Sequence, residues 1–334
     1  MTSTKISWQD KLLIRSLKLM GRLPLWFATG LGARLAGLIT WLPLPWASAY
    51  RVALVNIMLC YPELTYKEAA RLARRSMRQT GRTLTEFAHV WTQPAEKSID
   101  RISQVTGLEA LRCELWEKKP VLLLTLHQSS WELPNLLLGK ETPMTVFYQQ
   151  HGNALLNRLV TTAREGTGST LVPANNQGIR AGLAAMKRKE AVAILIDHNP
   201  HAENNPQAKF FGHSVRTSSL PHKLIQRFQP VVFFVGCHRG EGKTNDVRVY
   251  IEPAPKDIYS ADEAVSLAAM NQALETLISR YPEQYHWTYK RFRRINKVRY
   301  GVYDRKMVPL LKQAKKENKV IAMEDIVRMS FNNQ

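Results

Sequence analysis

The chain has 334 residues, 45% of them hydrophobic, so it is long and apolar enough to bury a sizeable core. Its formal net charge of +20 lies outside the range of an ordinary neutral enzyme and favours an anionic partner: nucleic acid, an anionic membrane or an acidic protein. The cysteines Cys60, Cys113 and Cys237 are widely spaced and odd in number. They match neither a disulfide framework nor a zinc motif, which indicates a reducing compartment.

The first 50 residues have the composition of a membrane anchor. Residues 1–22 interleave lysines and arginines with leucines, which predicts a basic amphipathic helix. Residues 23–50 are apolar and rich in tryptophan, but Arg34, Pro24, Pro43 and Pro45 interrupt them. No stretch reaches the roughly 18 apolar residues of a spanning helix. We expect an interfacial anchor or a shallow hairpin facing the anionic cytoplasmic leaflet, with a soluble core helix as the alternative.

The next two segments have contrasting patterns. Thr65 and Glu68 form a capping box, and apolar residues at helical spacing continue the pattern to about Val90, which predicts a long amphipathic helix. Residues 92–104 contain Pro94 and several charges, and they are predicted to be a connecting loop.

The central stretch of the sequence runs from Val121 to Leu138. Val121–Leu126 are apolar or β-compatible and predict a buried strand, and His127 follows at its carboxyl end, where open α/β sheets bind ligands. Glu132 lies five residues after His127. On one helix these side chains would point about 140° apart. They can meet only if His127 is on a loop and Glu132 is in the first helical turn.

A histidine and a carboxylate in that arrangement can perform acid–base chemistry. The imidazole of His127 can take a proton from a substrate hydroxyl, while Glu132 fixes its tautomer and stabilises the imidazolium. No protein nucleophile is then needed. The alternative is structural: a histidine at a strand end and a glutamate favoured by a helix dipole. The spacing alone leaves both interpretations open.

Strands and helices continue to alternate after this stretch. Such alternation predicts an α/β fold with a mostly parallel central sheet flanked by helices. The predicted strands are 144–148, 191–196, 231–235 and 247–251, the last nearer the sheet edge, and the predicted helices are 153–164, 179–186 and one opened by a capping box at Ser260–Glu263 that stops at Pro282.

Three later features carry polar chemistry. Asp197-His198-Asn199-Pro200-His201 contains ordinary metal ligands, but no second ligand cluster accompanies it, so a metal site is not favoured. Arg216 and the hydroxyl residues Thr217, Ser218 and Ser219 lead into a predicted helix, and a helix N-terminus of that kind suits either an anion site or an ordinary N-cap. The segment 287–299 interleaves basic and aromatic residues, which suits nucleic acid or a membrane surface.

Several motifs together resemble one family. His127-Gln-Ser-Ser-Trp-Glu132 resembles the His-x4-acid motif of the lysophospholipid acyltransferase superfamily, specifically of its lipid A late acyltransferase branch. The other motifs occur in the order of that branch: Arg51 with Asn56, Tyr61-Pro-Glu-Leu64, Gly107-Leu-Glu-Ala-Leu111, Phe210-Phe-Gly212 with Thr217, and Pro282-Glu-Gln-Tyr-His-Trp287 with Arg291-Phe292. One position departs from the pattern, because Gln149 stands where the branch usually has an arginine.

The resemblance implies a fold and a reaction. The fold would be glycerol-phosphate-acyltransferase-like, with a membrane anchor at 1–50, the acyltransferase domain at 51–300 and a tail at 301–334. An acyl chain would pass from a thioester of acyl carrier protein to a hydroxyl of a lipid A precursor, at the cytoplasmic face of the inner membrane of a Gram-negative bacterium. No cofactor, metal or nucleic acid is implied.

The resemblance also implies roles for individual residues. His127 would be the general base and Glu132 its orienting partner, with backbone amides or an arginine stabilising the oxyanion. Substrate-binding roles would fall to Asn153, Arg164, Asp197, Arg216 and Arg291. For Arg164, phosphate or carrier binding and a surface salt bridge are equal alternatives. The alternative functions are acyl transfer to another lysolipid or glycolipid, and a basic binding module without catalysis.

Overall fold

The computed structural model describes residues 7–42, 48–149, 153–200, 205–240, 245–293, 295 and 301–331. The chain divides into two compact units, each assembled from separate stretches. The first unit comprises residues 1–32, 82–196 and 223–254, and the second comprises 33–81, 197–222 and 255–334. The domain boundaries predicted at residues 50 and 300 remain a prediction.

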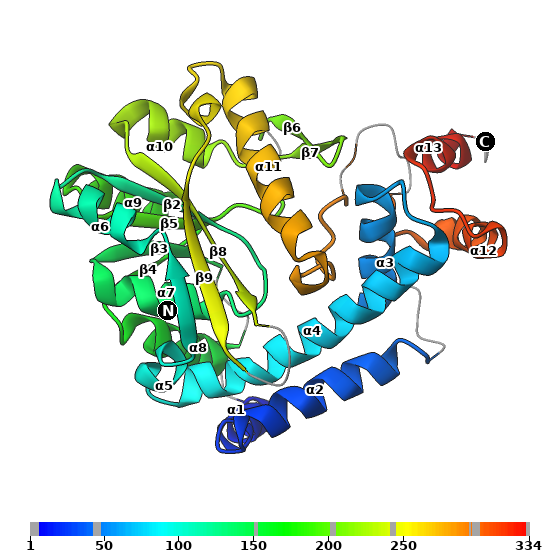
Figure 1. Cartoon of the computed structure of the whole chain (residues 1–334), viewed down its shortest axis with the longest axis horizontal. Coiled ribbons are helices and arrows are strands. Elements are labelled where there is room, and N and C mark those ends of the chain that lie inside the picture. The colour runs from blue at the N-terminus through cyan, green and yellow to red at the C-terminus, as the bar shows by residue number, and fades with distance from the viewer. Residues whose placement is uncertain are drawn as a thin grey trace. The chain divides into compact units, whose positions relative to one another are not determined.

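The first unit contains a mostly parallel sheet, as the alternation of strands and helices predicts. Among the described residues, seven strands form this sheet in the order β1-β9-β8-β2-β5-β3-β4 (Figure 1). All neighbouring pairs are parallel except β8 and β9, which are antiparallel. The strands are β1 (Ile102–Thr106), β2 (Val121–Thr125), β3 (Met144–Tyr148), β4 (Ser169–Pro173), β5 (Ala191–Leu195), β8 (Val231–Arg239) and β9 (Val247–Pro253).

Strand β2 is buried on both faces because it lies between β5 and β8 and helices cover the sheet on each side. Alternate side chains such as Val121 and Leu123 enter a core shared with Leu133 and Leu136, whereas Leu122 and Leu124 face the opposite side. A strand buried on both faces has a continuous apolar sequence rather than an alternating one, and Val121–Leu124 has such a sequence.

Helices cover both faces of this sheet. Helix α7 (Glu132–Glu141) packs on the face that carries Val146, whereas α9 (Asn176–Lys187) packs on the opposite face, where Gly182 lies against the ring of Phe147. The other helices wholly within the first unit are α1 (Trp8–Met20), α5 (Ala95–Ile99), α6 (Leu108–Trp116) and α8 (Ala154–Glu165). The helices α2 (Leu25–Ile39), α4 (Tyr66–Thr92) and α10 (Leu220–Phe228) each begin in one unit and end in the other.

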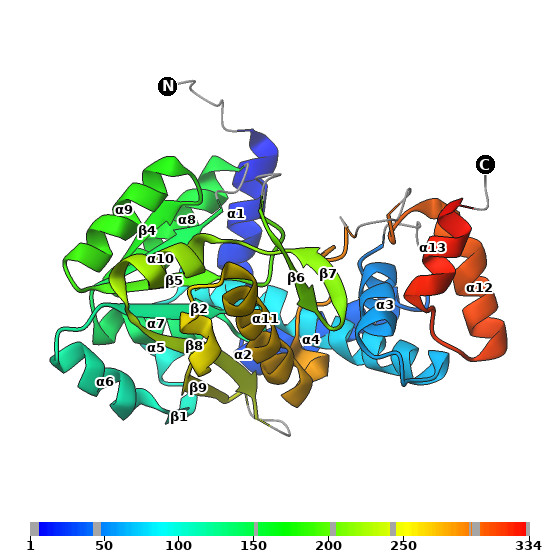
Figure 2. The same cartoon turned by 90° about the horizontal axis from the view of Figure 1, so that it is seen from above.

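The described residues of the second unit are mainly helical, with one β-hairpin (Figure 2). Strands β6 (Gln207–Phe210) and β7 (His213–Arg216) are antiparallel, and the two residues between them, Phe211 and Gly212, both have positive φ. A two-residue turn of that kind matches the twist of the strands it joins. The other elements are α3 (Ala49–Cys60), α11 (Glu263–Arg280), α12 (Val308–Glu317), α13 (Met323–Phe331) and the short 3-10 turns Lys256–Tyr259, Pro282–Gln284 and Arg305–Met307.

Two predictions about local structure are wrong. Residues 92–104 are not a connecting loop, because they contain α5 and the start of β1. As the edge strand of the sheet, β1 is mostly exposed or half-buried, so its sequence lacks the apolar run of an inner strand. The helix predicted to open with a capping box at Ser260 begins instead at Glu263, where the Asp262 side chain accepts the N–H of Ala264 at 2.8 Å.

Candidate active site

The histidine and the acid of the central motif lie at the carboxyl end of β2. His127 belongs to the loop after the strand, and Glu132 is the first residue of α7. This is the loop-and-first-turn arrangement that the five-residue spacing requires. The helix N-terminus suits a carboxylate, because the unpaired N–H groups there carry partial positive charge.

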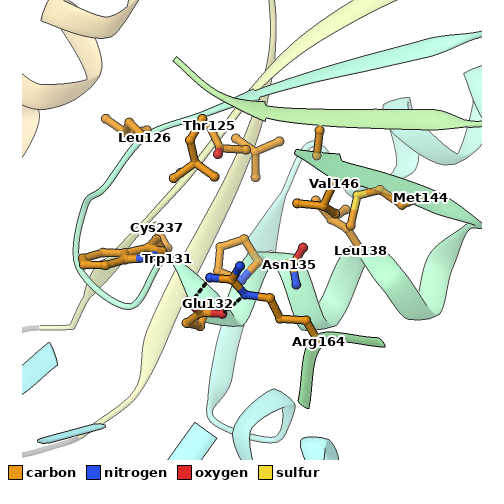
Figure 3. A pocket seen from close by; sticks show the side chains of 15 residues that line it. Thr125, Leu126, Trp131, Glu132, Asn135, Leu138, Met144, Val146, Arg164 and Cys237 are labelled. Atoms are coloured by element: carbon orange, nitrogen blue, oxygen red, sulfur yellow. Dashed lines mark hydrogen bonds and ion pairs between the residues drawn. The ribbon is translucent and has the colours of Figure 1, made fainter. Parts of the chain in front are cut away.

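Glu132 is held by a residue that the sequence did not pair with it. Both carboxylate oxygens accept hydrogen bonds from Arg164 of α8, at 2.8 Å from Nε and 2.5 Å from Nη2 (Figure 3). The Glu132 side chain is 2% exposed and the Arg164 side chain 15% exposed. Burial would lower the pKa of Arg164, but the charge of Glu132 and the hydrogen bonds to it together outweigh burial, so the pKa is raised. The two-pronged contact therefore fixes the plane of the carboxylate.

His127 packs against an aromatic row. Its ring meets that of Trp131 edge to face, with centroids 5.0 Å apart. Trp131 meets Phe87 of α4 in the same way at 5.0 Å, and Phe87 stacks on Trp91 at 4.7 Å. The imidazole thus has an apolar wall on one side. Contact between His127 and the Glu132 carboxylate remains a prediction.

A small cavity of about 40 Å³ lies beside the Glu132–Arg164 pair (Figure 3). Its lining is mostly apolar and comes from β2, β3, β5, β8 and α7, with Asn135 among the few polar residues. Such a volume holds on the order of one or two water molecules. The ion pair therefore lies in a largely apolar setting, where electrostatic interactions are stronger than in water.

Asn153 caps α8. Its Oδ1 accepts the N–H of Leu156 at 2.9 Å, and its Nδ2 donates to Asp10 of α1 at 2.6 Å. These contacts satisfy a free helix-end N–H and join two helices of the first unit. The predicted substrate contact of Asn153 stays a prediction.

The remaining predicted site residues belong to the second unit. Arg291 is 3% exposed, and its Nη1 donates to the backbone oxygen of Arg216 at 2.7 Å and to Asn199 Oδ1 at 2.8 Å. Burial lowers the pKa of Arg291, and the neighbouring Tyr285 and Asp197 partly offset this effect. Asp197, Arg216 and Arg291 are therefore brought together, although their substrate contacts remain predictions.

The motif segments of the second unit also meet. Asn56 of α3 donates to the backbone oxygens of Trp287 at 2.6 Å and Tyr289 at 2.8 Å, and its Oδ1 accepts a hydrogen bond from Tyr303. His213, next to the Phe211-Gly212 turn, hydrogen-bonds to the backbone oxygen of Leu59 at 2.8 Å. Motifs that are far apart in the sequence thus contact one another in the second unit.

Some predicted features fall outside the described residues. These are Pro43, Pro45 and Trp46 of the N-terminal segment, His201 of the weighed metal cluster, and Arg294, Lys297 and Arg299 of the basic segment. Within the described part of the chain, no group of three or more histidine, cysteine, aspartate or glutamate side chains could hold a metal ion.

The class of protein in which this strand, loop and helix N-terminus occur is given by the sequence comparison. The profile of the bacterial lipid A biosynthesis acyltransferases matches residues 2–294. The chain belongs to this family, and it is therefore an acyltransferase of lipid A biosynthesis.

Relatives of this family in Escherichia coli K12 cover most of the chain. The lipid A biosynthesis palmitoleoyltransferase is 27% identical over 72% of this chain and 78% of its own length. The lauroyltransferase is 25% identical over 71% of this chain and 77% of its own length. The myristoyltransferase is 24% identical over 73% of this chain and 75% of its own length. Because three relatives named for different acyl groups are almost equally similar, identity does not select an acyl chain.

Proposed function

We propose that the protein transfers a fatty acyl chain from an acyl carrier protein thioester to a hydroxyl of a lipid A precursor. The family membership supports acyl transfer as the reaction and lipid A biosynthesis as the pathway. The donor, the acceptor hydroxyl and the catalytic residues are our proposals. The observation that best supports the proposal is the buried Glu132 at the carboxyl end of β2, whose two carboxylate oxygens accept hydrogen bonds from Arg164.

In the proposed mechanism, His127 is the general base. It removes the proton of the acceptor hydroxyl while the oxygen attacks the thioester carbonyl carbon. The tetrahedral intermediate then collapses, the carbon–sulfur bond breaks, and the imidazolium returns its proton to the leaving thiolate. Glu132 orients the ring and stabilises its charged form, and Arg164 keeps that carboxylate in place. No acyl-enzyme is formed.

The charge balance supports anionic partners. A net charge of +20 would speed the encounter with a phosphorylated lipid and with an acidic carrier protein. Substrate contacts are proposed for Asn153, Arg164, Asp197, Arg216 and Arg291 in addition to the structural contacts described above.

The first two helices support membrane association. In α1, Lys11, Arg15 and Lys18 are exposed among leucines, and α2 exposes Trp26 and Leu35 together with other large apolar side chains. No helix within the described residues is long and apolar enough to cross a membrane. We propose that α1 and α2 lie in the headgroup region of the cytoplasmic leaflet of the inner membrane.

Mass spectrometry tests the reaction. A Kdo-bearing lipid A precursor is incubated with acyl carrier protein thioesters of several chain lengths and with wild-type protein, His127→Ala or Glu132→Gln. The wild type should add one acyl mass, and loss of the base should lower the rate about 10²–10⁴-fold. Glu109→Gln is the matched control, because Glu109 is an exposed glutamate of α6 whose partner is a surface arginine.

The outcomes separate the alternatives. An equal gain of mass with His127→Ala would rule out His127 as the base. Acylation of other lysolipids but not of the lipid A precursor would change the acceptor class. Salt-sensitive binding without any acyl transfer would favour a binding module.

A further inference from the structure

The loop between His127 and Glu132 is clamped along its middle. Gln128, Ser129 and Ser130 are 0%, 1% and 1% exposed, which is unusual for polar residues of a connecting loop. Gln128 accepts a hydrogen bond from Tyr250 of β9 at 2.5 Å, and its backbone oxygen accepts one from Cys237 of β8 at 3.5 Å. Residues of β8 and β9 therefore hold this loop on the side that faces the sheet.

Helix α4 holds the loop from the other side. Thr83 and Glu86 are three residues apart and so lie on one face of the helix. Thr83 Oγ1 donates to the backbone oxygen of Ser129 at 3.0 Å, and Ser130 Oγ donates to Glu86 Oε2 at 2.5 Å. Two consecutive loop residues are thus tied to consecutive turns of one helix.

The clamped loop contains a strained residue. Ser129 has a φ of +55°, a left-handed conformation that costs about 1 kcal/mol or more outside glycine. Such a conformation persists only where its surroundings impose it. The hydrogen bonds on both sides of Ser129 impose it here.

Glu86 is the charged centre of the clamp. It is fully buried and pairs with Arg101 through one oxygen and with Arg239 through the other. Arg239 also donates to Thr83 at 2.9 Å, so one guanidinium supports both residues of α4 that hold the loop. Three desolvated charges are not an efficient means of stabilising a fold, because apolar packing usually does as well. Their contact with the loop next to His127 suggests a role in function.

We propose that Glu86 is a positioning residue for acyl transfer, acting through Ser130 to hold the His127–Glu132 loop in its working conformation. The proposal rests on the proposed role of His127 as base. Glu86 itself touches neither substrate nor reacting atoms, and Arg101 and Arg239 keep its carboxylate ionised and in place.

Ser130→Ala is the cleanest test, because it removes the hydroxyl and leaves Glu86 with both arginines. Misplacement of the loop should lower kcat about 10–100-fold with KM unchanged within about twofold. Ser214→Ala is the matched control, since this exposed serine of β7 hydrogen-bonds to the neutral side chain of Gln207. Wild-type kcat in Ser130→Ala would overturn the proposal.

A double variant distinguishes action through His127 from an independent effect. If Ser130 works only by placing His127, adding Ser130→Ala to His127→Ala should cause no further loss of rate. Multiplying effects would contradict the proposal. If His127→Ala alone keeps full activity, His127 is not the base, and the proposed mechanism fails independently of the result for Ser130→Ala.

Hydrogen exchange supplies a readout that does not depend on activity. In Ser130→Ala, peptides covering residues 126–132 should exchange faster than in the wild type, while the thermal unfolding midpoint falls by no more than about 6 °C and peptides of β2 are unchanged. Unchanged exchange in the loop would show that Glu86 does not position it. An equal increase throughout the first unit would mean a purely structural role and would also overturn the proposal.

Discussion

Arg164 shows how a single residue acquires its role from a distant neighbour. The sequence offered substrate binding or a surface salt bridge, and the structure instead gives a buried, two-pronged pair with Glu132 at 32 residues' separation. A surface ion pair contributes little to stability, whereas removing the partner of a buried carboxylate strongly destabilises the folded protein. Arg164 therefore supports the proposed catalytic carboxylate whether or not it also contacts a substrate.

Glu86 should make the stability of the protein sensitive to acid. Burial alone would raise its pKa, but Arg239, Arg101 and the Ser130 hydrogen bond lower it to about 2. The unfolded chain therefore binds a proton at a higher pH than the folded one does. The contribution, on the order of 3 kcal/mol, is fully present above about pH 4.5 and is lost as the pH falls toward about 2.

Acid titrations of unfolding can isolate this group. Ser130→Ala removes one of the interactions that lower the pKa of Glu86, so its unfolding midpoint on acidification should move to higher pH than that of the wild type. Ser214→Ala should keep the wild-type midpoint, because Ser214 contacts a neutral amide. Circular dichroism between about pH 6 and pH 2 measures both. Coincident curves for Ser130→Ala and wild type would contradict this assignment.

At the scale of elements, strong local patterns identified the inner strands and the helices beside them. The predicted strand 144–148 agrees with β3, and the Thr65–Glu68 capping box opens α4, with the N–H of Thr65 donating to Glu68 at 2.8 Å. The missed strands β1 and β4 are the two edges of the sheet and β6 and β7 form the hairpin, and edge or hairpin strands show little apolar periodicity. Pairing with a neighbour, rather than local sequence, makes them strands.

Gly107 is an element boundary at which only glycine fits. It precedes α6 with a φ of +81°, and a Cβ added there would lie 1.9 Å from the backbone oxygen of Ile251 in β9. Gly107→Ala should therefore lower the free energy of unfolding by about 2–4 kcal/mol. Gly30→Ala in α2 is the control, because its Cβ would meet nothing within 4 Å and alanine favours a helix. Denaturant titrations of both variants measure the difference, and equal effects would contradict the steric argument.

At the scale of the whole molecule, excess positive charge and exposed apolar side chains occur together in the N-terminal helices. Helix α2 has 15 residues, which corresponds to about 22 Å, less than the roughly 30 Å of a bilayer core. Trp26 and Leu35 are 68% and 52% exposed. Large apolar side chains exposed at this density indicate a surface that meets a partner, and the proposed partner is an anionic membrane.

Vesicle binding tests this proposal. The double variant Trp26→Ser/Leu35→Ser should bind vesicles of anionic phospholipid at least about tenfold more weakly than the wild type, since it loses roughly 2–4 kcal/mol of apolar burial. Trp116→Ser is the matched control, because Trp116 of α6 is 87% exposed but lies outside the N-terminal helices. Sedimentation with vesicles measures binding. A comparable loss in Trp116→Ser would point to a general loss of apolar surface instead.

The sequence by itself determined the α/β class, the inner strands, the His127–Glu132 spacing and the family, because these depend on local periodicity and on motif order. Only the tertiary structure decided that Glu132 pairs with Arg164, that Glu86 lies between Arg101 and Arg239 against Ser130, and that Asn56 holds the segment around Trp287. These contacts join residues 15 to 231 positions apart in the sequence. Local sequence patterns do not reveal such pairings. A buried polar group needs a partner, and the fold determines which polar groups are buried next to each other.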